Sequence, residues 1–566
     1  MKIIDTSVQD FSTVISNNII YADKTRHVWE LTKTASAYFL SRPRRFGKSL
    51  LLSTIAELFK GSSDPLQDPQ GLFKNLWISG KEANYNFTDT YPIINLSMSV
   101  ANDTSESVSI FLKSKLQDIA YTYGISLTDS LPGVMFNDLI LTLKRKYNKK
   151  IVLLIDEYDD PVNSVIGDPH LAEKNAMVLK GFYAILKEHQ INFRFVLLTG
   201  VTRYFLLWGS GVLNHLTDLT MKDKYADICG FTYEEFDKCF SDRFQITMEE
   251  FKEKGYLDKN CGVSELRQKI FNKYDGYSWN GKTRVLNPYS LLNAFMDQSL
   301  QNYWVSLEPS KQILNAIMSK DPLGLTADKM IDLPEDSLDM ASTISSITPI
   351  SSLFQTGYLT IDKITIDEDD IYYTFKTPNK EVDSAFRKEF SKCLFNFLNI
   401  NRHKQQTDLI NAIITEDSNK LSKLIDSFFG AIPAALHISK EAYYHSVFFA
   451  YLEGLTKLKA LPEIPGADGT PDILCVIDTD LYVIIELKYK NDLELNPMAN
   501  DQKAKTTMRK LAISALEAID AKNYLRPYLA KAKKILRLGL GVYGRGRTEA
   551  ILENEEQAKA RAKLNA

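Results

Sequence analysis

The stretch YFLSRPRRFGKSLLL, residues 38–52, passes from an apolar run through a polar loop into a second apolar run. This pattern predicts a short strand that ends near Ser41 and a helix that begins at Ser49. Between such a strand and helix, free backbone N–H groups and the positive end of the helix surround a phosphate chain. The stretch therefore predicts a nucleotide site in which Lys48 reaches the β- and γ-phosphates and the hydroxyl of Ser49 binds Mg²⁺.

The loop departs in one respect from the phosphate-binding pattern GxxxxGK[ST]. Arg42 occupies the position of the first glycine, and a proline, two arginines and a phenylalanine follow it. A chance Gly-Lys-Ser at the start of a helix is the alternative interpretation. The residues that we expect to bind the nucleotide here are Arg44, Arg45, Phe46, Gly47, Lys48 and Ser49.

A second stretch, KIVLLIDEYDDP at residues 150–161, predicts a buried strand followed by two carboxylates. In open α/β sheets, ligands bind at the carboxyl ends of the strands. Asp156 is placed to hold Mg²⁺ through water, and Glu157 to accept a proton from the water that attacks the γ-phosphate. A buried strand with a solvated acidic turn is the alternative. The position about 100 residues after the loop is usual for P-loop ATPases and favours the catalytic interpretation.

A third predicted strand, residues 193–198, ends in a polar segment that contains Thr199 and Arg203. Thr199 is placed to position the attacking water, and Arg203 to sense or stabilise the γ-phosphate. An ordinary cap for Thr199 and a surface ion pair for Arg203 are equally good interpretations. Arg203 could act in its own chain or in a neighbouring copy, so a homo-oligomer stays open.

Composition excludes several classes of protein. The chain has 566 residues with 44% hydrophobic content, enough for about two to four domains. No apolar run approaches the roughly 18 residues that span a bilayer, and the N-terminus turns acidic at Asp5, so we expect neither a membrane span nor a signal peptide. The five cysteines are scattered and never spaced as CxxC, which favours a reducing cytoplasm and no structural zinc. A net charge of −3 excludes a globally basic coat for nucleic acid.

A second ordered set of elements follows residue 395. The hydrophobic pattern predicts a helix at 438–455, strands at 471–477 and 481–488, a helix at 507–522 and a strand at 535–543. This order fits the α-β-β-α-β core of a PD-(D/E)XK nuclease.

Glu486 and Lys488 are two residues apart on one predicted strand and therefore share a face. If the hairpin loop consists of residues 478–480, Asp472 falls directly opposite Glu486. Directly opposed Cβ atoms lie roughly 5 Å apart, and two carboxylates at that distance repel unless a positive charge lies between them. Mg²⁺ and Lys488 would supply that charge. We therefore predict Asp472 and Glu486 as catalytic metal ligands, and Lys488 as the group that supports negative charge on the phosphate.

A surface hairpin that merely carries these charges is the alternative interpretation. Glu441 opens the preceding helix and matches the helix acid of the nuclease pattern, although a glutamate in a first turn also suits the helix dipole. Ala518, with Glu517 beside it, stands where the nuclease pattern usually has glutamine. The fold therefore has stronger support than cleavage.

The segment between residues 225 and 390 is predicted to be a mainly helical lid with a hairpin near 357–375. Tyr277, Trp279 and Tyr289 could stack nucleotide bases. Aromatic residues beside glycine and proline more often build turns and small cores, which we favour here.

Together these motifs resemble the AAA-ATPase-like family, whose members join a P-loop domain to a C-terminal nuclease domain of the PD-(D/E)XK superfamily. The arginine-proline departure in the loop is part of that family's pattern. The resemblance implies an ATP-binding hydrolase that uses Mg²⁺, joined to a nuclease-like domain that uses Mg²⁺ or Mn²⁺ and acts on nucleic acid, above all DNA. The motifs follow one another along nearly the whole chain: IIYADKT (19–25), FLSRPRRFGKSLLLS (39–53), VLLIDEYDDP (152–161), LLTGVTRYF (197–205), YADICGFT (225–232), YDGYSW (274–279), NPYS (287–290), QTGYLTI (355–361) and PNKEV (378–382).

The C-terminal end of the chain is locally basic. From residue 501 to 566 there are fifteen Lys and Arg against seven Asp and Glu, a local excess of eight positive charges. Such a surface is what phosphate binding requires. Helical runs such as Lys531, Lys533, Lys534 and Arg537 are equally often solvated faces, and residues 553–566 are expected to form an exposed helix or tail.

We therefore expect an α/β protein with a P-loop parallel sheet at 1–224, a mainly helical lid at 225–392, an α/β nuclease-like domain at 393–550 and a charged tail at 551–566. Two functions compete. The first is an ATP-hydrolysing enzyme whose nucleotide state gates a metal-dependent nuclease. The second is a nucleotide-switched regulator with a degenerate nuclease domain that holds nucleic acid or a protein without cutting. Ala518 favours the second function modestly, and the Asp-Glu-Lys set favours the first.

Overall fold

The computed structural model of this protein forms two compact units. One lies within Met1–Ala316 and Ile331–Ser384, and the other within Ala385–Ala566. The structure describes residues 1–33, 37–61, 69–99, 105–203, 212–306, 333–334, 349–368, 370–433, 437, 439–453, 455, 458–462, 471–477, 480–491, 501–522, 524–525, 528 and 532–565.

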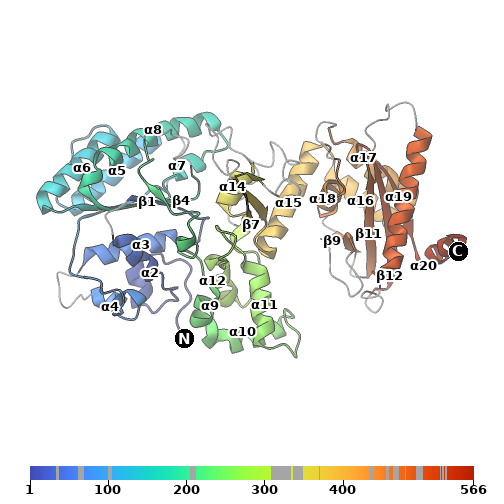
Figure 1. Ribbon diagram of the computed structural model, residues 1–566, viewed down its shortest axis with the longest axis horizontal. Coiled ribbons are helices and arrows are strands. Elements are labelled where there is room, and N and C mark those ends of the chain that lie inside the picture. The colour runs from blue at the N-terminus through green and yellow to red at the C-terminus, as the bar shows by residue number, and fades with distance from the viewer. Residues whose placement is uncertain are drawn as a thin grey trace. The chain divides into compact units, whose positions relative to one another are not determined.

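A five-stranded parallel sheet forms the core of the first unit (Figure 1). Strand β4 lies between β1 and β3, so the segments that follow these three strands leave the sheet at the same edge. Every residue of β3 is buried, in keeping with its five consecutive apolar residues before Asp156. The expected α/β fold with a parallel sheet is confirmed. The strand order is β2 (Ile93–Ser97), β3 (Ile151–Asp156), β4 (Phe193–Gly200), β1 (Ala37–Ser41) and β5 (Thr217–Asp218).

Helices cover both faces of this sheet, α3 on one side and α5, α6 and α8 on the other (Figure 1). The apolar face of α5 is buried at Val108, Leu112 and Leu116. The helices of this layer and of the N-terminal segment are α1 (Phe11–Ser16), α2 (Thr25–Thr32), α3 (Lys48–Lys60), α4 (Pro69–Phe73), α5 (Ser105–Thr122), α6 (Pro132–Tyr147), α7 (Asp160–Asn163) and α8 (Pro169–Glu188), with 3-10 turns at Trp77–Ser79 and Gln190–Asn192.

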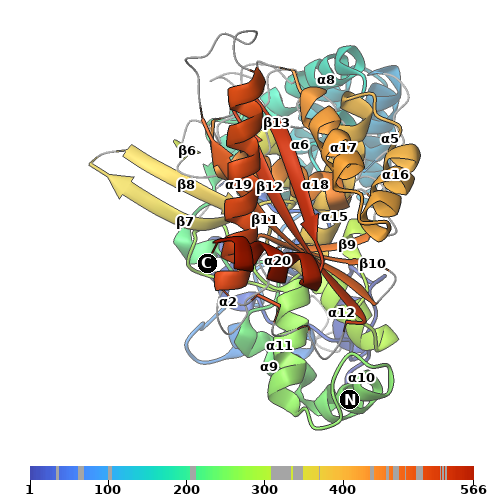
Figure 2. The same cartoon turned by 90° about the vertical axis from the view of Figure 1, so that its right-hand side faces the viewer.

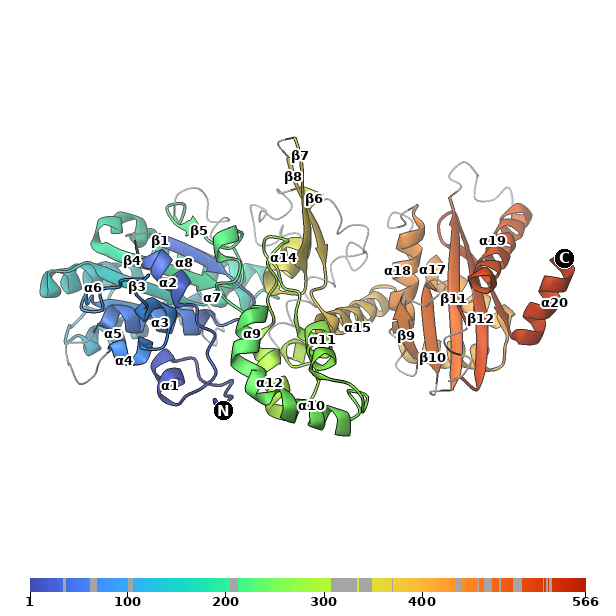
Figure 3. The same cartoon turned by 60° about the horizontal axis from the view of Figure 1, so that its bottom comes forward.

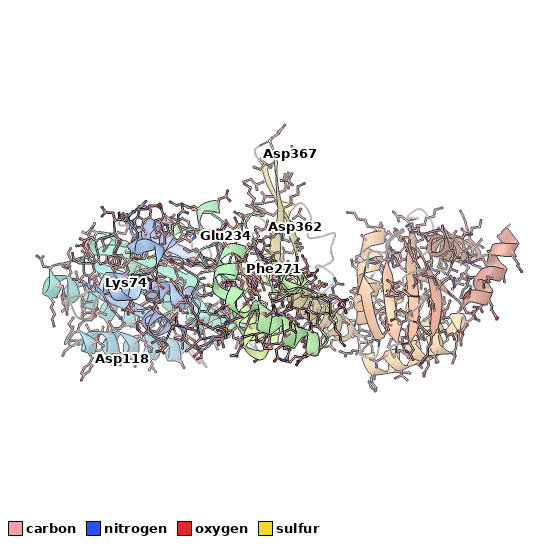
Figure 4. All side chains as sticks on the ribbon, turned by 90° about the horizontal axis from the view of Figure 1, so that it is seen from below. Lys74, Asp118, Glu234, Phe271, Asp362 and Asp367 are labelled. Carbon is pink, nitrogen blue, oxygen red and sulfur yellow. The ribbon has the colours of Figure 1, made fainter. Side chains whose placement is uncertain are left out.

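The remainder of the first unit has a helical part and a small sheet, as expected for residues 225–390. The helices share an aromatic core that includes Phe236, Phe240 and Phe295. In Figure 4, Asp362 and Asp367 mark the hairpin of the small sheet, and Phe271 stacks on Tyr233 at 4.8 Å. The elements are α9 (Tyr233–Phe240), α10 (Phe244–Glu253), α11 (Val263–Tyr274), α12 (Pro288–Asp297), α14 (Pro349–Thr356), β6 (Leu333–Pro334), β7 (Thr360–Asp367) and β8 (Asp370–Lys376), with 3-10 turns at Asp223–Tyr225, Ser241–Arg243 and Trp304–Ser306.

Helix α15 (Lys380–Phe397) begins in the first unit and continues into the second. The second unit contains a five-stranded mixed sheet with α19 on one face and α17 and α18 on the other (Figure 2 and Figure 3). Its strand order is β13 (Arg547–Glu553), β12 (Lys534–Tyr543), β11 (Leu481–Lys490), β10 (Ile473–Ile477) and β9 (Leu458–Pro462), and its helices are α16 (Arg402–Ile414), α17 (Ser418–Gly430), α18 (Glu441–Glu453), α19 (Asp501–Ala521) and α20 (Glu555–Asn565).

The α-β-β-α-β order predicted for this unit corresponds to α18, β10, β11, α19 and β12, and β11 runs parallel to β12. The outer strands β9 and β13 were not predicted. The expectation of a helical basic run was wrong where the structure describes it, because Lys534 and Arg537 belong to β12, in which the neighbouring Leu536 and Leu538 are buried. Lys531 lies outside the described residues.

Two glycines of β12 let α19 approach the sheet closely. A Cβ atom on Gly539 would lie 2.2 Å from the carbonyl oxygen of Ala512, and one on Gly541 would lie 2.1 Å from that of Met508. These glycines pair with Glu486 and Lys488 of β11. The alternation Leu-Gly-Leu-Gly in β12 therefore brings α19 against the strand that carries the predicted nuclease residues.

Candidate functional site

A cavity of about 460 Å³ lies where β1 and β3 end in the first unit. Helix α3 begins there at Lys48, and its N-cap Gly47 has a φ of 93°, a left-handed conformation that glycine adopts without strain. Residues predicted from the sequence make up a large part of the lining, namely Arg44, Arg45, Gly47, Lys48, Ser49, Asp156 and Glu157.

Lys48 holds a buried positive charge inside the loop. Its ammonium donates hydrogen bonds to the carbonyl oxygens of Arg42 at 2.9 Å and Pro43 at 3.0 Å. Burial lowers the pKa of Lys48, while the carboxylates of Asp156 and Glu157 act in the opposite direction. Lys48, Asp156 and Glu157 line the same cavity, a set of charges that can bind a polyphosphate together with Mg²⁺.

Asp156 and Thr199 are joined across neighbouring strands. The Thr199 hydroxyl at the end of β4 donates to Oδ1 of Asp156 at 2.6 Å, and both side chains are buried. This contact fixes the orientation of the Asp156 carboxylate. The predicted position of Thr199 beside the acidic strand is the one that the structure shows.

Glu157 has an unusual backbone and a perturbed carboxyl group. Its φ is 52°, a region that residues other than glycine seldom adopt and that often marks functional positions. Burial raises the pKa of Glu157, and the neighbouring charge of Asp156 raises it further. A carboxylate with a raised pKa is a better proton acceptor, as a general base requires.

The next two acids hold the loops around the cavity. Asp160 forms an ion pair with Arg44 at 2.6 Å. Asp159 accepts hydrogen bonds from the backbone N–H of Val201 at 3.1 Å and of Thr202 at 2.6 Å. The acidic run therefore does more than the sequence indicated, because it anchors both the arginine loop and the segment after β4.

Arg42, the departure from the glycine pattern, has a structural role. Its guanidinium is buried and donates to the carbonyl oxygens of Ser41, Thr220 and Tyr225 at 2.8, 3.0 and 2.9 Å. It also lies 3.9 Å from the ring centre of Trp279, a cation–π contact. Arg42 thereby ties the loop to the segment that follows the sheet.

Phe46 is likewise turned away from the cavity. Its ring is 1% exposed and packs edge-on against Tyr277 at 4.8 Å and Trp279 at 5.7 Å. The Phe46 side chain thus anchors the loop, and its contact with a nucleotide stays a prediction. Tyr277 and Trp279 form a small core, the interpretation favoured above, whereas Tyr289 lines the cavity and lies beneath Arg45 at 5.4 Å.

Arg203 lies outside the lining of the cavity. Its Nε is 3.1 Å from Oδ2 of Asp218, and its backbone N–H donates to Oε1 of Gln355 at 2.7 Å. The ion-pair interpretation describes this arrangement. A contact of Arg203 with the γ-phosphate, in its own chain or a neighbouring copy, stays a prediction.

Apart from Tyr289, which was weighed as a base-stacking residue, sequence reasoning missed the remaining lining residues. Ser97 ends β2 and pairs with Asp156, and Ser99 follows two residues later. The sequence could have indicated these serines only through their position, because they lie at the end of the strand that neighbours the Asp156 strand. The lining also includes apolar side chains that suit a flat base, namely Val8, Ile19, Ile20, Pro288, Tyr289 and Leu292.

The second predicted site lies on the β10–β11 hairpin. Ile473 pairs with Ile485 and Ile477 with Leu481, so the predicted register is the observed one. Asp472 therefore falls opposite Glu486. Its Oδ2 accepts a hydrogen bond from the backbone N–H of Leu487 at 2.8 Å, which holds the carboxylate over the neighbouring strand.

Glu486 is 2% exposed, and its Oε1 lies 3.3 Å from the ammonium of Lys488. Its Oε2 is buried with no hydrogen-bond partner in the described part of the chain. Burial raises the pKa of Glu486, and the negative charge of Asp472 raises it further. The ammonium groups of Lys488 and Lys522 lower the pKa of Glu486 only in part, so a further cation beside the two carboxylates would be stabilising.

Glu441, at the start of α18, reaches the same strand. Its Oε2 accepts from the backbone N–H of Tyr489 at 2.9 Å, and its Oε1 is 3.9 Å from the Lys488 ammonium. The structure therefore brings all four predicted nuclease residues to one strand. Glu441 faces Lys488 rather than the opposed carboxylates.

Two residues of this site were not predicted. The Lys522 ammonium, just beyond α19, lies 3.9 Å from Oε1 of Glu486, and Nε2 of His445 is 3.0 Å from the carbonyl oxygen of Asp472. Lys522 lies one helical turn after Ala518 and His445 one turn after Glu441. Because each residue lies one turn after a position already singled out, helical spacing could have suggested both. Only the tertiary structure shows that the end of α19, and so Lys522, lies beside β11.

The opposed carboxylates fit a divalent cation. Glu486 offers a buried oxygen without a partner, and repulsion from Asp472 would be relieved by positive charge. Within the described ranges, no three acidic, histidine or cysteine side chains gather as a metal cluster. A cation here would therefore have two carboxylate ligands and take the others from backbone oxygens, water or phosphate.

Several cations of the basic C-terminal end form ion pairs within the second unit. Lys533 pairs with Asp480, Lys534 with Glu416, and Arg537 with Asp520. Lys533 and Lys534 are nevertheless exposed, as the solvated-face interpretation expects, whereas Arg537 is largely buried against Asp520. None of the helices that the structure describes is long and apolar enough to cross a membrane.

Comparisons with known proteins agree with the resemblance drawn from the motifs. Residues 5–206 match the family model described as a predicted AAA-ATPase, and residues 439–550 match that of the PD-(D/E)XK nuclease superfamily. The expected combination of the two domains is thereby confirmed over these ranges. The chain is also 26% identical over 553 residues to an "Uncharacterized protein in vnfD 5'region" of Azotobacter chroococcum mcd 1, covering 95% of this chain and 96% of that protein.

Proposed function

We propose that this protein binds and hydrolyses ATP at the cavity beside Lys48 and cleaves nucleic acid, above all DNA, at the β10–β11 hairpin. One observation carries the proposal: at each site a lysine ammonium lies beside a pair of neighbouring carboxylates. Lys48 is set against Asp156 and Glu157, and Lys488 against Glu486 with Asp472 opposite. Such a set binds phosphate and a divalent cation together.

At the ATP site, different residues of the chain bind the phosphates, hold the metal and activate the water. Lys48 and the N–H groups at the start of α3 hold the phosphates, with Ser49 and Asp156 as the residues that would hold Mg²⁺. Thr199 orients Asp156, and Glu157 removes the proton from the attacking water. Bound Mg²⁺ would neutralise charge on the phosphates. The apolar lining residues, with Tyr289, would contact the base.

At the nuclease-like site, Asp472 and Glu486 would hold Mg²⁺ or Mn²⁺. The cation would polarise the phosphate and lower the pKa of a bound water. Lys488 stabilises the negative charge that develops on the phosphate, and Glu441 positions Lys488 and the end of β11.

A specific observation favours the second candidate, a nucleotide-switched regulator that binds without cutting. Among the residues that the structure describes, no third metal-ligating side chain joins Asp472 and Glu486 at the hairpin, and α19 carries Ala518 where the nuclease pattern has glutamine. Two carboxylates suffice to bind nucleic acid through a metal ion that bridges the protein and a phosphate, even without cleavage.

The deciding experiment incubates the purified protein with labelled single- and double-stranded DNA and RNA, with and without ATP, in Mg²⁺ or Mn²⁺. Cleavage that persists in Lys48→Ala and disappears in Asp472→Asn supports the nuclease. Metal-dependent binding without cleavage of any substrate supports the regulator instead. Loss of ATP hydrolysis in Lys48→Ala but not in Asp472→Asn assigns the two activities to their separate sites.

A further inference from the structure

Glu381 is a buried acid on the first turn of α15, and neither proposed reaction uses it. Its side chain is 0% exposed. One carboxylate oxygen accepts from the hydroxyl of Ser290 at 2.7 Å, and the other from the backbone N–H of Trp304 at 2.7 Å. Two segments distant in sequence are thereby fastened to the start of this helix.

Trp304 connects Glu381 to the phosphate-binding loop through hydrogen bonds to both. Its indole N–H donates to the carbonyl oxygen of Arg44 at 2.9 Å. The ring is 0% exposed and packs edge-on against Tyr358 at 5.4 Å, so it has little room to move independently. A displacement of the Arg44 carbonyl must therefore shift Trp304 or break the hydrogen bond.

A second route leads from the loop to the same carboxylate. Arg45 lies over the ring of Tyr289, which lines the nucleotide cavity. The next residue of α12 is Ser290, which donates to Glu381. Consecutive arginines of the loop thus reach one buried carboxylate, each through a short chain of contacts.

Helix α15 connects the two compact units. The boundary between them falls between Ser384 and Ala385, within the helix Lys380–Phe397. A change at Glu381 acts on the first turn of a continuous helix whose last three turns belong to the unit with the nuclease-like site.

We propose that Glu381 and Trp304 couple occupancy of the nucleotide cavity to the nuclease-like unit through α15. The coupling rests on the function proposed above. A polyphosphate competes with Asp160 for the Arg44 guanidinium, so the loop takes a different arrangement with and without nucleotide. The change in the loop alters the hydrogen bonds of Trp304 and Ser290 to Glu381, and α15 transmits the resulting shift to the second unit. Because coupling between binding sites is reciprocal, nucleic acid must in turn change the affinity for nucleotide.

The test uses the full-length chain and a non-hydrolysable ATP analogue. Trp304→Phe keeps the aromatic packing but removes the indole N–H, and Glu381→Gln keeps the shape but removes the charge. Hydrogen exchange of residues 385–397 is measured with and without the analogue, beside the affinity for the analogue and the rate of DNA cleavage. Trp29→Phe is the matched control, because it removes an indole hydrogen bond of 2.8 Å to Ala83 outside the route.

In the parent and in Trp29→Phe, we expect the analogue to change exchange and cleavage by about fivefold or more. Trp304→Phe and Glu381→Gln should bind the analogue within about threefold of the parent yet lose most of both responses. An undiminished exchange response in both variants, or an equal loss in Trp29→Phe, overturns the coupling.

The outcomes also separate this inference from the proposed function. A parent that binds the analogue but cuts no substrate contradicts the nuclease, and hydrogen exchange then decides the coupling alone. A parent that does not bind the analogue contradicts both proposals. Thermal melting of each variant shows whether a lost response reflects unfolding.

Discussion

Asp472 lies directly across the β10–β11 pair from Glu486 and accepts a hydrogen bond from the backbone N–H of the residue after it, Leu487, at 2.8 Å. The Asp472 side chain thus has two separable effects. Its charge opposes that of Glu486, whose pKa is raised by burial and then by Asp472. Its oxygen satisfies a backbone donor. Substitutions can remove one effect without the other.

Asp472→Asn should remove the charge and keep an oxygen for Leu487. We expect cleavage to be lost and metal-free thermal stability to stay at or above that of the parent, because the repulsion is relieved. Asp472→Ala also leaves the N–H unpaired and should be less stable by about 1 kcal/mol. Differential scanning calorimetry in a Lys48→Ala background, with and without Mg²⁺, checks both. The metal-dependent rise in melting temperature should shrink in each variant, and an unchanged rise would disprove the metal site.

Lys48→Ala should abolish nucleotide binding, because the variant loses the buried ammonium beside Asp156 and Glu157. Glu157→Gln should bind ATP like the parent but hydrolyse it slower by a factor on the order of 10² or more, since the proton acceptor is gone. Fluorescent-nucleotide titration and phosphate release measure the two effects. Equal ATP affinity in Lys48→Ala and the parent would refute the assignment.

Thr199→Val should slow ATP hydrolysis by about tenfold or more, because it removes the hydroxyl that holds Asp156 at 2.6 Å while keeping a similar shape. Thr199→Ser retains the hydroxyl and should stay within about threefold of the parent. Steady-state phosphate release at saturating ATP compares them. Equal rates in the valine and serine variants would mean that the contact has no part in hydrolysis.

Gly541→Ala should destabilise the second unit by about 1–3 kcal/mol, because its methyl group would meet the Met508 carbonyl at 2.1 Å and push α19 from the sheet. Gly430→Ala is the matched control in the same unit, since a Cβ there meets no atom within 4 Å. Urea unfolding monitored by circular dichroism gives both free energies. Similar values for the two variants would show that the close approach of α19 is not important for stability.

Glu381 should make the stability of the first unit depend on pH. Burial raises its pKa from 4.5 to about 7, with Lys273 as a partly compensating positive charge. The folded protein therefore binds this proton more tightly than the unfolded chain. The resulting stability is fully present below pH 4.5 and is lost as the pH rises through 7, up to about 3 kcal/mol.

Glu381→Gln lacks this titration. The difference in melting temperature between the variant and the parent should therefore move in the variant's favour between pH 5 and pH 8. Calorimetry in parallel buffers checks the sign. A constant difference over this range would show that Glu381 has an ordinary pKa.

The sequence alone determined much of the fold and of both sites. Apolar runs identified β3, β4, β10 and β11, because strands that are buried on both faces or packed under a helix contain few polar residues. The placement of Asp472 opposite Glu486 needed only a loop length, because antiparallel pairing has a period of two residues. These features depend on neighbours along the chain, so local patterns suffice to predict them.

Only the tertiary structure decided the roles of the loop arginines and the additional members of the sites. Arg42 and Phe46 belong to an anchor with Trp279, and Arg44 contacts Trp304, a residue more than two hundred positions away. Lys522 reaches Glu486 because two glycines let α19 lie against β12. The sequence shows which side chains are charged or aromatic. Their contact partners depend on packing between distant segments, which the local periodicity of helices and strands does not specify.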